Sequence, residues 1–401
     1  MRGTLDVWPA LPIVIFGDGL STSTSGADNI IVALQQNDRV CELDLWDITS
    51  SQLEKVAAVM QEPFPVLTRL GLEWRSIEDT SSPPLVPDSF MGGSAPRLRS
   101  LHLNRIPFPG LPKLLSSANG LVLLLLSNIP HSGYISPDAL VTCLSDLTSL
   151  KDVTFELQSP RSRPDRVSRR PPPPMRRSFP ALTRLSFKGV SEYLEDFVAR
   201  IDTPQLHRLS ITFFNQLIFD TPHLSQFISR IPKFRSPDEA RIVFHDSVVK
   251  VTLPSPARRF GYEALTLGVS SRESDWQLSS LAQLCRTSLP ALAKVEHLYI
   301  HEGGYMSPRR WQNDVENSQW LEVLHLFTAA RNLYLSKEFS PRIAPALKEL
   351  VGGRTTEVLP TLQSLSFEDL PSGPVQEDVG DFLAARQLSG HPITVSSWER
   401  S

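Results

Sequence analysis

The chain has 401 residues, 41% hydrophobic and 21% charged, so most of it can bury a core. Its formal net charge of -3 lacks the basic excess of general nucleic-acid-binding or membrane-surface proteins. The three cysteines are far apart and belong to no CxxC or Cys/His cluster, which argues against a disulfide framework and a structural zinc site. We expect a cytoplasmic or nuclear protein that needs no cofactor and binds neither nucleic acid nor membrane.

The first apolar segment runs from Val7 to Phe16 and is interrupted by Pro9 and Pro12. It lacks a basic region and a small-residue cleavage site, so a signal peptide is not expected. The β-branched run Ile13–Ile15 predicts a buried strand instead.

A six-residue pattern, apolar-x-x-apolar-x-apolar, recurs at intervals of roughly 23 to 35 residues, which is typical of a solenoid. Its copies begin at Val40, Leu67, Leu98, Leu121, Leu150, Leu182, Leu206, Val295, Ala330 and Leu362. This is the strand signature of a leucine-rich repeat. We therefore predict an α/β leucine-rich-repeat solenoid over residues 1–401, with a curved parallel sheet, helices on its convex side and a ribonuclease-inhibitor-like repeat.

Helical patterns follow several of these strands. Ser51 and Glu54 form a capping box before an apolar stripe, and Ser136 and Pro137 are typical of a helix start. Similar stripes begin after Ser191 and Ser340, and Val379, Phe382 and Leu383 mark a last helix. Strand and helix therefore alternate, as a parallel sheet requires.

Two segments depart from the pattern. Between residues 213 and 271 we expect irregular repeats or a hairpin, with close-set strands at 240–245, 248–253 and 264–267. Residues 159–178 are rich in arginine and proline and almost free of apolar side chains, so we expect a disordered or polyproline-II insertion. Its role stays open between a tolerated insertion and a site for acidic or proline-reading partners.

No catalytic or metal-binding motif stands out, so we do not expect an enzyme. Residues 351–356 contain two glycines but lack the lysine of a phosphate loop, and they follow a helix. His297 and His301 fall on a predicted strand without a third ligand, which favours exposed histidines over a metal site. Glu42 and Asp44 are expected on a solvated strand surface.

The remaining candidate for a functional site is the face of the predicted sheet that carries no helices. Side chains alternate across a strand, so the residues between the leucines should form one concave, chemically mixed surface. The candidate partner-binding residues are Asp44, Trp46, Arg69, Glu73, His102, Asp152, Glu156, Arg184, Lys188, Tyr299, His301 and Tyr334. We favour Trp46, Tyr299 and Tyr334 as anchors because aromatic residues dominate interface hot spots; the alternative is that these residues only aid solubility. The same rule exposes Leu123 and Leu125, which indicates either an adhesive apolar spot or a strand that is covered.

The order of these elements resembles the F-box/leucine-rich-repeat-like proteins of mushroom-forming fungi over almost the whole chain. The resemblance is carried by Leu5–Phe16, Asp28–Leu45, Gln319–Leu335 and, most specifically, Lys337–Leu362. It implies that the repeats recruit a substrate, while an F-box docks on the adaptor of a cullin-RING ubiquitin ligase. No F-box helices are seen before the first repeat, so we expect adaptor binding only if an F-box lies upstream.

These patterns lead to two hypotheses. The first is a non-catalytic protein-binding scaffold that resembles the substrate-recognition part of an F-box protein and binds a protein partner on its concave face. The alternative is a regulator of a small GTPase built on the same solenoid.

Overall fold

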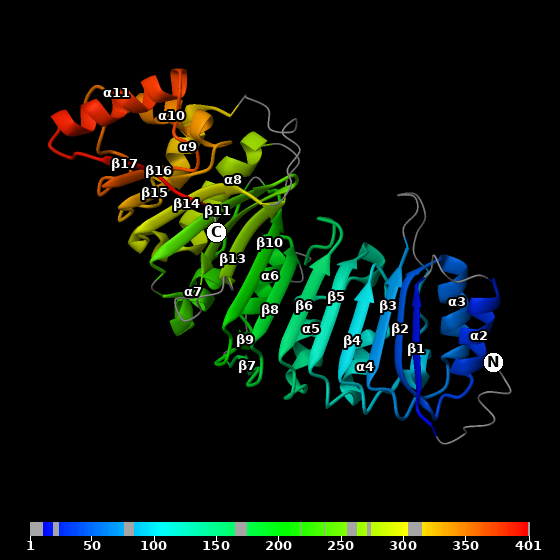
Figure 1. The fold of residues 1–401 in the computed structure, drawn as a ribbon. Coiled ribbons are helices and arrows are strands. Elements are labelled where there is room, and N and C mark those ends of the chain that lie inside the picture. Colours follow the sequence, from blue (N-terminus) through cyan, green and yellow to red (C-terminus); the bar gives the residue numbers. More distant parts are fainter. Residues whose placement is uncertain are drawn as a thin grey trace. The chain divides into compact units, whose positions relative to one another are not determined.

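The computed structural model describes residues 11–18, 24–75, 84–164, 175–216, 218–235, 237–254, 263–270, 274–303 and 315–399. The chain divides into two compact units, Met1–Leu206 and His207–Ser401. Each unit pairs a sheet with helices, drawn from blue to green for the first and from green to red for the second (Figure 1).

The sheet of the first unit is parallel and follows the chain. Its strands, in spatial order, are β1 (Ile13–Asp18), β2 (Val40–Ile48), β3 (Arg69–Trp74), β4 (Ser100–Asn104), β5 (Leu123–Ile129), β6 (Asp152–Leu157) and β8 (Arg184–Gly189). The register places the leucines of successive repeats opposite one another. One such row is Leu43, Leu70, Leu101, Leu124, Val153 and Leu185, every member of it buried.

The helices of the first unit are α2 (Thr24–Leu34), α3 (Ser50–Val59), α4 (Leu111–Ser117), α5 (Pro137–Ser145) and α6 (Ser191–Val198), with 3-10 turns η1 (Phe90–Gly93) and η2 (His131–Gly133). Ser136 caps α5 as predicted, and its hydroxyl accepts a hydrogen bond from the Ala139 N–H. The capping box of α3 lies two residues earlier than predicted. Thr49 and Gln52 form it, because the helix already begins at Ser50.

These helices pack on the leucine side of the sheet. Phe155 of β6 stacks on Tyr193 of α6 with ring centroids 5.3 Å apart, and the Tyr193 hydroxyl donates to the Ile135 carbonyl at 2.7 Å. The residues between the leucines point to the opposite side. We call that side of each sheet the helix-free face.

The sheet of the second unit contains one antiparallel interruption. Its strands, in spatial order, are β10 (Arg208–Phe214), β13 (Glu263–Ser270), β12 (Val248–Pro254), β11 (Glu239–His245), β14 (His297–Glu302), β15 (Asn332–Leu335), β16 (Ser364–Phe367) and β17 (Thr394–Ser397). β12 is antiparallel to both neighbours, and His245 pairs with Val248, so Asp246 and Ser247 make a two-residue hairpin turn. β10 and β13, β11 and β14, and the successive strands from β14 to β17 pair in parallel. The expected close-set strands thus lie within the sheet itself.

The helices of the second unit are α7 (Pro222–Arg230), α8 (Ser274–Ser288), α9 (Asn317–Leu324), α10 (Ser340–Lys348) and α11 (Pro374–Leu388), with turns η3 (Pro232–Phe234) and η4 (Pro290–Lys294). Phe244 of β11 contacts Trp320 of α9 and Phe339 at the start of α10, at centroid distances of 5.8 and 4.5 Å. These helices therefore also cover the leucine side. Gly352 and Gly353 follow α10 with positive φ angles of 102° and 111°, in line with the predicted helix end.

Each of the ten leucine patterns coincides with a parallel strand, and the leucines point toward the helices. The fold is a leucine-rich-repeat solenoid of α/β character. No helix in the described part of the chain is both long and apolar enough to cross a membrane.

The C-terminal end of the arginine- and proline-rich segment is ordered, although we expected disorder or polyproline II there. Residues 165–174 lie outside the described residues, but β7 (Arg177–Ser178) pairs with β9 (Ile201–Asp202). The Arg177 N–H also donates to the Arg200 carbonyl at 2.8 Å. Backbone hydrogen bonding therefore orders the C-terminal end of this segment despite its polar composition.

Candidate partner-binding face

Asp44 is buried, which corrects the expectation of a solvated carboxylate. Its side chain is 2% exposed and accepts hydrogen bonds from Arg69 at 2.7 and 3.1 Å. Gly71 lies opposite Asp44 in register, and its missing side chain leaves the room that the carboxylate occupies. Oδ1 of Asp44 is buried without a hydrogen-bond partner among the described residues.

A second ion pair also joins an aspartate to an arginine on the next strand. Asp152 and Arg184 lie opposite each other on β6 and β8, and the Arg184 Nε lies 2.8 Å from the Asp152 carboxylate. Four of the candidate residues are thus paired with one another. These pairs present hydrogen-bonding groups in fixed positions to a bound protein. Their net charge is small, because each carboxylate is partly neutralised by its arginine.

The other candidates of the first unit are half-buried or exposed on the helix-free face. Trp46 is 45% exposed. Glu73, His102, Glu156 and Lys188 are half-buried. Leu123 and Leu125 are also half-buried on the helix-free face, where side chains of β4 and β6 flank them in register.

In the second unit, the sheet brings three aromatic side chains together, which we call the aromatic cluster: Tyr299, Tyr334 and Trp398. The two tyrosines are opposite each other on β14 and β15 and stack with centroids 4.1 Å apart. Trp398 meets both edge-on, at 5.8 and 5.9 Å. All three are half-buried, so part of each ring faces solvent.

Trp398 was not among the predicted residues. It follows β17, yet its Nε1–H donates to the Leu335 carbonyl on β15, at 3.2 Å. Its ring can reach across β16 because the outward residues there, Ser364 and Ser366, are small. The only sequence signal was the extended, β-branched character of residues 393–397, which indicates one further strand.

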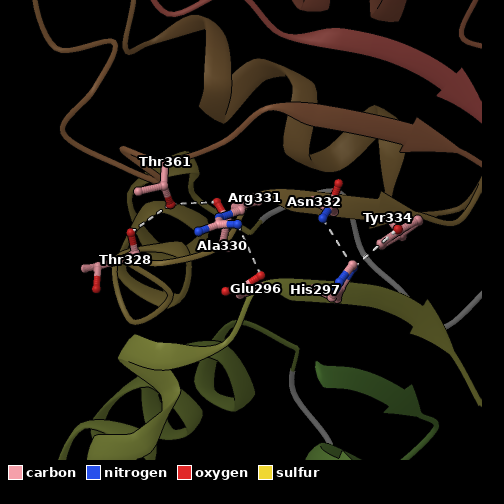
Figure 2. A network of polar contacts seen from close by, with 8 residues as sticks. All are labelled: Glu296, His297, Thr328, Ala330, Arg331, Asn332, Tyr334 and Thr361. Carbon is pink, nitrogen blue, oxygen red and sulfur yellow. Dashed lines mark hydrogen bonds and ion pairs between the residues drawn. The ribbon is translucent and has the colours of Figure 1, made fainter. Parts of the chain in front are cut away.

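Polar groups hold the tyrosines in place. The Nδ1 atom of His297 lies 3.3 Å from Asn332 Nδ2 and 3.5 Å from the Tyr334 hydroxyl. Figure 2 shows His297 between these two residues of the neighbouring strand. The guanidinium of Arg241, paired with Glu239 at 2.5 Å, lies 5.6 Å from the Tyr299 ring centre.

The Tyr299 phenol stays neutral at physiological pH. Burial raises its pKa above the usual value, and the charge of Glu239 acts in the same direction. The cluster therefore presents uncharged rings to a partner.

The loops before these strands are also fixed. Arg331 lies 3.6 Å from Glu296, and the Thr361 hydroxyl lies 3.1 and 3.0 Å from the carbonyls of Thr328 and Ala330 (Figure 2). The strands that carry the cluster are thus tied together at their N-terminal ends.

Three carboxylates gather at the opposite ends of these strands. Glu302, Glu338 and Glu368 offer oxygens within 4.8 Å of one another. Glu302 accepts from the Ser336 hydroxyl at 2.7 Å, and Glu368 accepts from the Lys337 N–H at 3.2 Å. Burial raises the pKa of Glu338, and hydrogen bonding to Glu302 adds to this shift. His301 lies beside this group, 2.8 Å from the Glu302 carbonyl. We assign no ion to the group, since hydrogen bonds account for its arrangement.

Comparisons with known proteins include a structural likeness. No family model and no curated protein matches the chain. The crystal structure of the leucine-rich repeat-containing protein LegL7 from Legionella pneumophila matches with 14% identity and a TM-score of 0.29. The match covers 88% of this chain and 92% of that chain.

Proposed function

We propose that this chain is a protein-binding scaffold whose helix-free faces hold the partner, with the aromatic cluster as the main anchor. The observation that carries the proposal is the position of Tyr299, Tyr334 and Trp398. They lie half-buried on the face that the helices leave open, and one another's rings hold them in place. Aromatic side chains of this kind supply most of the binding energy at protein interfaces.

Preorganisation strengthens the argument. A side chain that is immobilised only on binding loses roughly 0.5–1.5 kcal/mol of conformational entropy. The stack, the hydrogen bond from Trp398 and the contact between His297 and Tyr334 already restrict these rings. The cluster can therefore bind a partner with a smaller entropic loss than mobile side chains would.

Affinity capture with matched variants tests this proposal. The wild-type chain, the Tyr299→Ala/Tyr334→Ala variant and a Leu388→Ala control would be compared under identical conditions. Leu388 is 90% exposed at the end of α11 and belongs to the helix layer. We expect the double variant alone to lose a captured protein, provided that all three chains unfold at similar denaturant concentrations. If the double variant captures the same protein as the wild-type chain, the proposal is wrong.

The resemblance to F-box/leucine-rich-repeat-like proteins extends this proposal to substrate recognition for a cullin-RING ubiquitin ligase. The bound protein would then be degraded in a manner that depends on this chain. Its half-life in cells should lengthen when the chain is removed and should shorten again when the wild-type chain is restored. An unchanged half-life would contradict the ligase role and leave the binding role intact.

A further inference from the structure

The edge strand β1 presents large apolar side chains to solvent. Val14 and Phe16 are 49% and 58% exposed and alternate with Ile15, which is 6% exposed, so they lie on the helix-free face. Trp46 of β2 lies diagonally from Phe16, whose opposite residue in register is Asp44. Within the described residues, β1 pairs only with β2, and its other edge carries the unused backbone groups of an edge strand.

Soluble proteins seldom leave such an edge open. Edge strands usually carry charges, bulges or a covering segment, because a bare apolar edge pairs with any available strand. From Leu11 to Gly17 the strand and its approach contain no charged residue.

We propose that β1 is a self-association surface, through which two copies of this chain pair their β1 strands antiparallel about a twofold axis at Ile15. In an antiparallel pair, directly opposite residues point to the same face. Val14 then lies opposite Phe16 of the second copy, and Phe16 lies opposite Val14 of the second copy. The contact is isologous, since each strand presents the same surface to the other.

Charge complementarity favours a second copy as the occupant. In this register Asp18, at the end of β1, lies opposite Pro12 of the second copy. Next to Pro12, the Arg39 Nε donates to the Leu11 carbonyl at 3.1 Å. Opposite charges therefore approach each other at both ends of the paired strands. A shift by two residues in one direction would place Phe16 opposite Pro12, and in the other it would place Val14 opposite Asp18, so both alternatives lose an apolar cross-strand pair.

The experiment is sedimentation equilibrium of the full chain, with two complementary variants. Val14→Lys and Phe16→Glu should each raise the dimer dissociation constant at least about fivefold, because each replaces both apolar cross-strand pairs. An equal mixture of the two variants should form a heterodimer within about twofold of the wild-type affinity, since it has one Lys–Glu pair and one Phe–Val pair. Thermal unfolding of the dilute chains checks that both variants fold.

Leu370→Lys serves as the matched control, since Leu370 is 63% exposed in the second unit and plays no part in the proposed pair. It should leave the dimer dissociation constant unchanged. The inference is overturned if the wild-type chain stays monomeric at high micromolar concentration, if Val14→Lys and Phe16→Glu dimerise like wild type, or if their mixture fails to recover affinity. It does not depend on the aromatic cluster, so the proposed function can fail while this inference stands.

Discussion

Tyr299 and Tyr334 stack with ring planes 6° from parallel and centroids 4.1 Å apart. They occupy opposite positions on the adjacent parallel strands β14 and β15. The stack follows from the spacing of neighbouring strands, about 4.8 Å, which is close to the separation of two packed rings. The repeat thus turns two tyrosines that are 35 positions apart in the chain into one rigid surface.

Truncation of the stack should weaken partner binding. We expect Tyr334→Ala to lower the affinity for the captured partner roughly 30-fold, or about 2 kcal/mol, as is typical of an aromatic hot spot. Tyr334→Phe keeps the ring and loses the contacts of its hydroxyl with His297 and Tyr299, so it should stay within about threefold of wild type. Titration calorimetry measures both. An equal loss for the two variants would show that the hydroxyl, and not the ring, makes the contact.

The buried carboxylate of Asp44 makes Gly71 sensitive to substitution. A Cβ atom at this position would collide with the Asp44 carboxylate, so Gly71→Ala should lower the free energy of unfolding by about 1–3 kcal/mol. Asp44→Ala removes the carboxylate that the new Cβ atom would meet. The Asp44→Ala/Gly71→Ala variant should therefore recover most of the lost free energy of unfolding. Urea unfolding of the two single variants and the double variant measures this coupling. Strictly additive effects would mean that the two side chains do not compete for the same space.

Arg386 holds α11 against the loop before β16. The side chain is fully buried and donates to the carbonyls of Thr355, Pro360 and Leu362 at 3.0, 3.4 and 3.1 Å. Arg386→Met should lower the free energy of unfolding by about 2–4 kcal/mol, because buried carbonyls lose their donor. Arg354→Met is the control, since Arg354 is 57% exposed and its ion pair with Glu357 is screened by solvent, so its loss should leave the free energy of unfolding almost unchanged. A similar loss for both variants would contradict this role.

The buried thiol of Cys285 should make stability fall at alkaline pH. Burial raises its pKa from 9.0 to about 12, so the thiol stays protonated in the folded chain while the unfolded chain releases its proton above pH 9.0. The stabilisation is complete below pH 9.0, and it is lost as the pH rises toward 12. At about pH 10 the loss should be about 1 kcal/mol. Urea unfolding between about pH 8 and about pH 10 should show a flatter decline for Cys285→Ala than for wild type. Parallel declines would mean that the thiol is not responsible.

The repeat spacing predicted the fold because it depends on local chemistry. The apolar-x-x-apolar-x-apolar pattern places alternate side chains on one face of a strand wherever it occurs, and each copy coincides with a strand. The helix start at Ser136 was equally local, since the capping hydroxyl and the N–H that donates to it lie within one turn. Near Thr49, two overlapping capping boxes were possible. The sequence favoured Ser51 and Glu54, while the chain uses Thr49 and Gln52.

The features missed from the sequence depend on neighbouring strands. Asp44 is buried because of Gly71 and Arg69, which lie on the next strand of the sheet. Trp398 contacts the tyrosines because the small serine side chains on β16 let its ring extend to the Leu335 carbonyl. No periodicity within one strand carries this information, since the register of two strands decides it. The assignment of the candidate residues to a binding site therefore stays a prediction.

Site-specific photo-crosslinking shows which face of the sheet meets the bound protein. A photoreactive amino acid would replace Thr154 or Ser210 on the helix-free faces, and Glu54 or Glu322 in the helix layer. We expect a helix-free position to yield a crosslink to the protein captured by the wild-type chain, and we expect Tyr299→Ala/Tyr334→Ala to abolish it. Crosslinks to that protein from the helix-layer positions alone would mean that the helices, and not the helix-free faces, bind it.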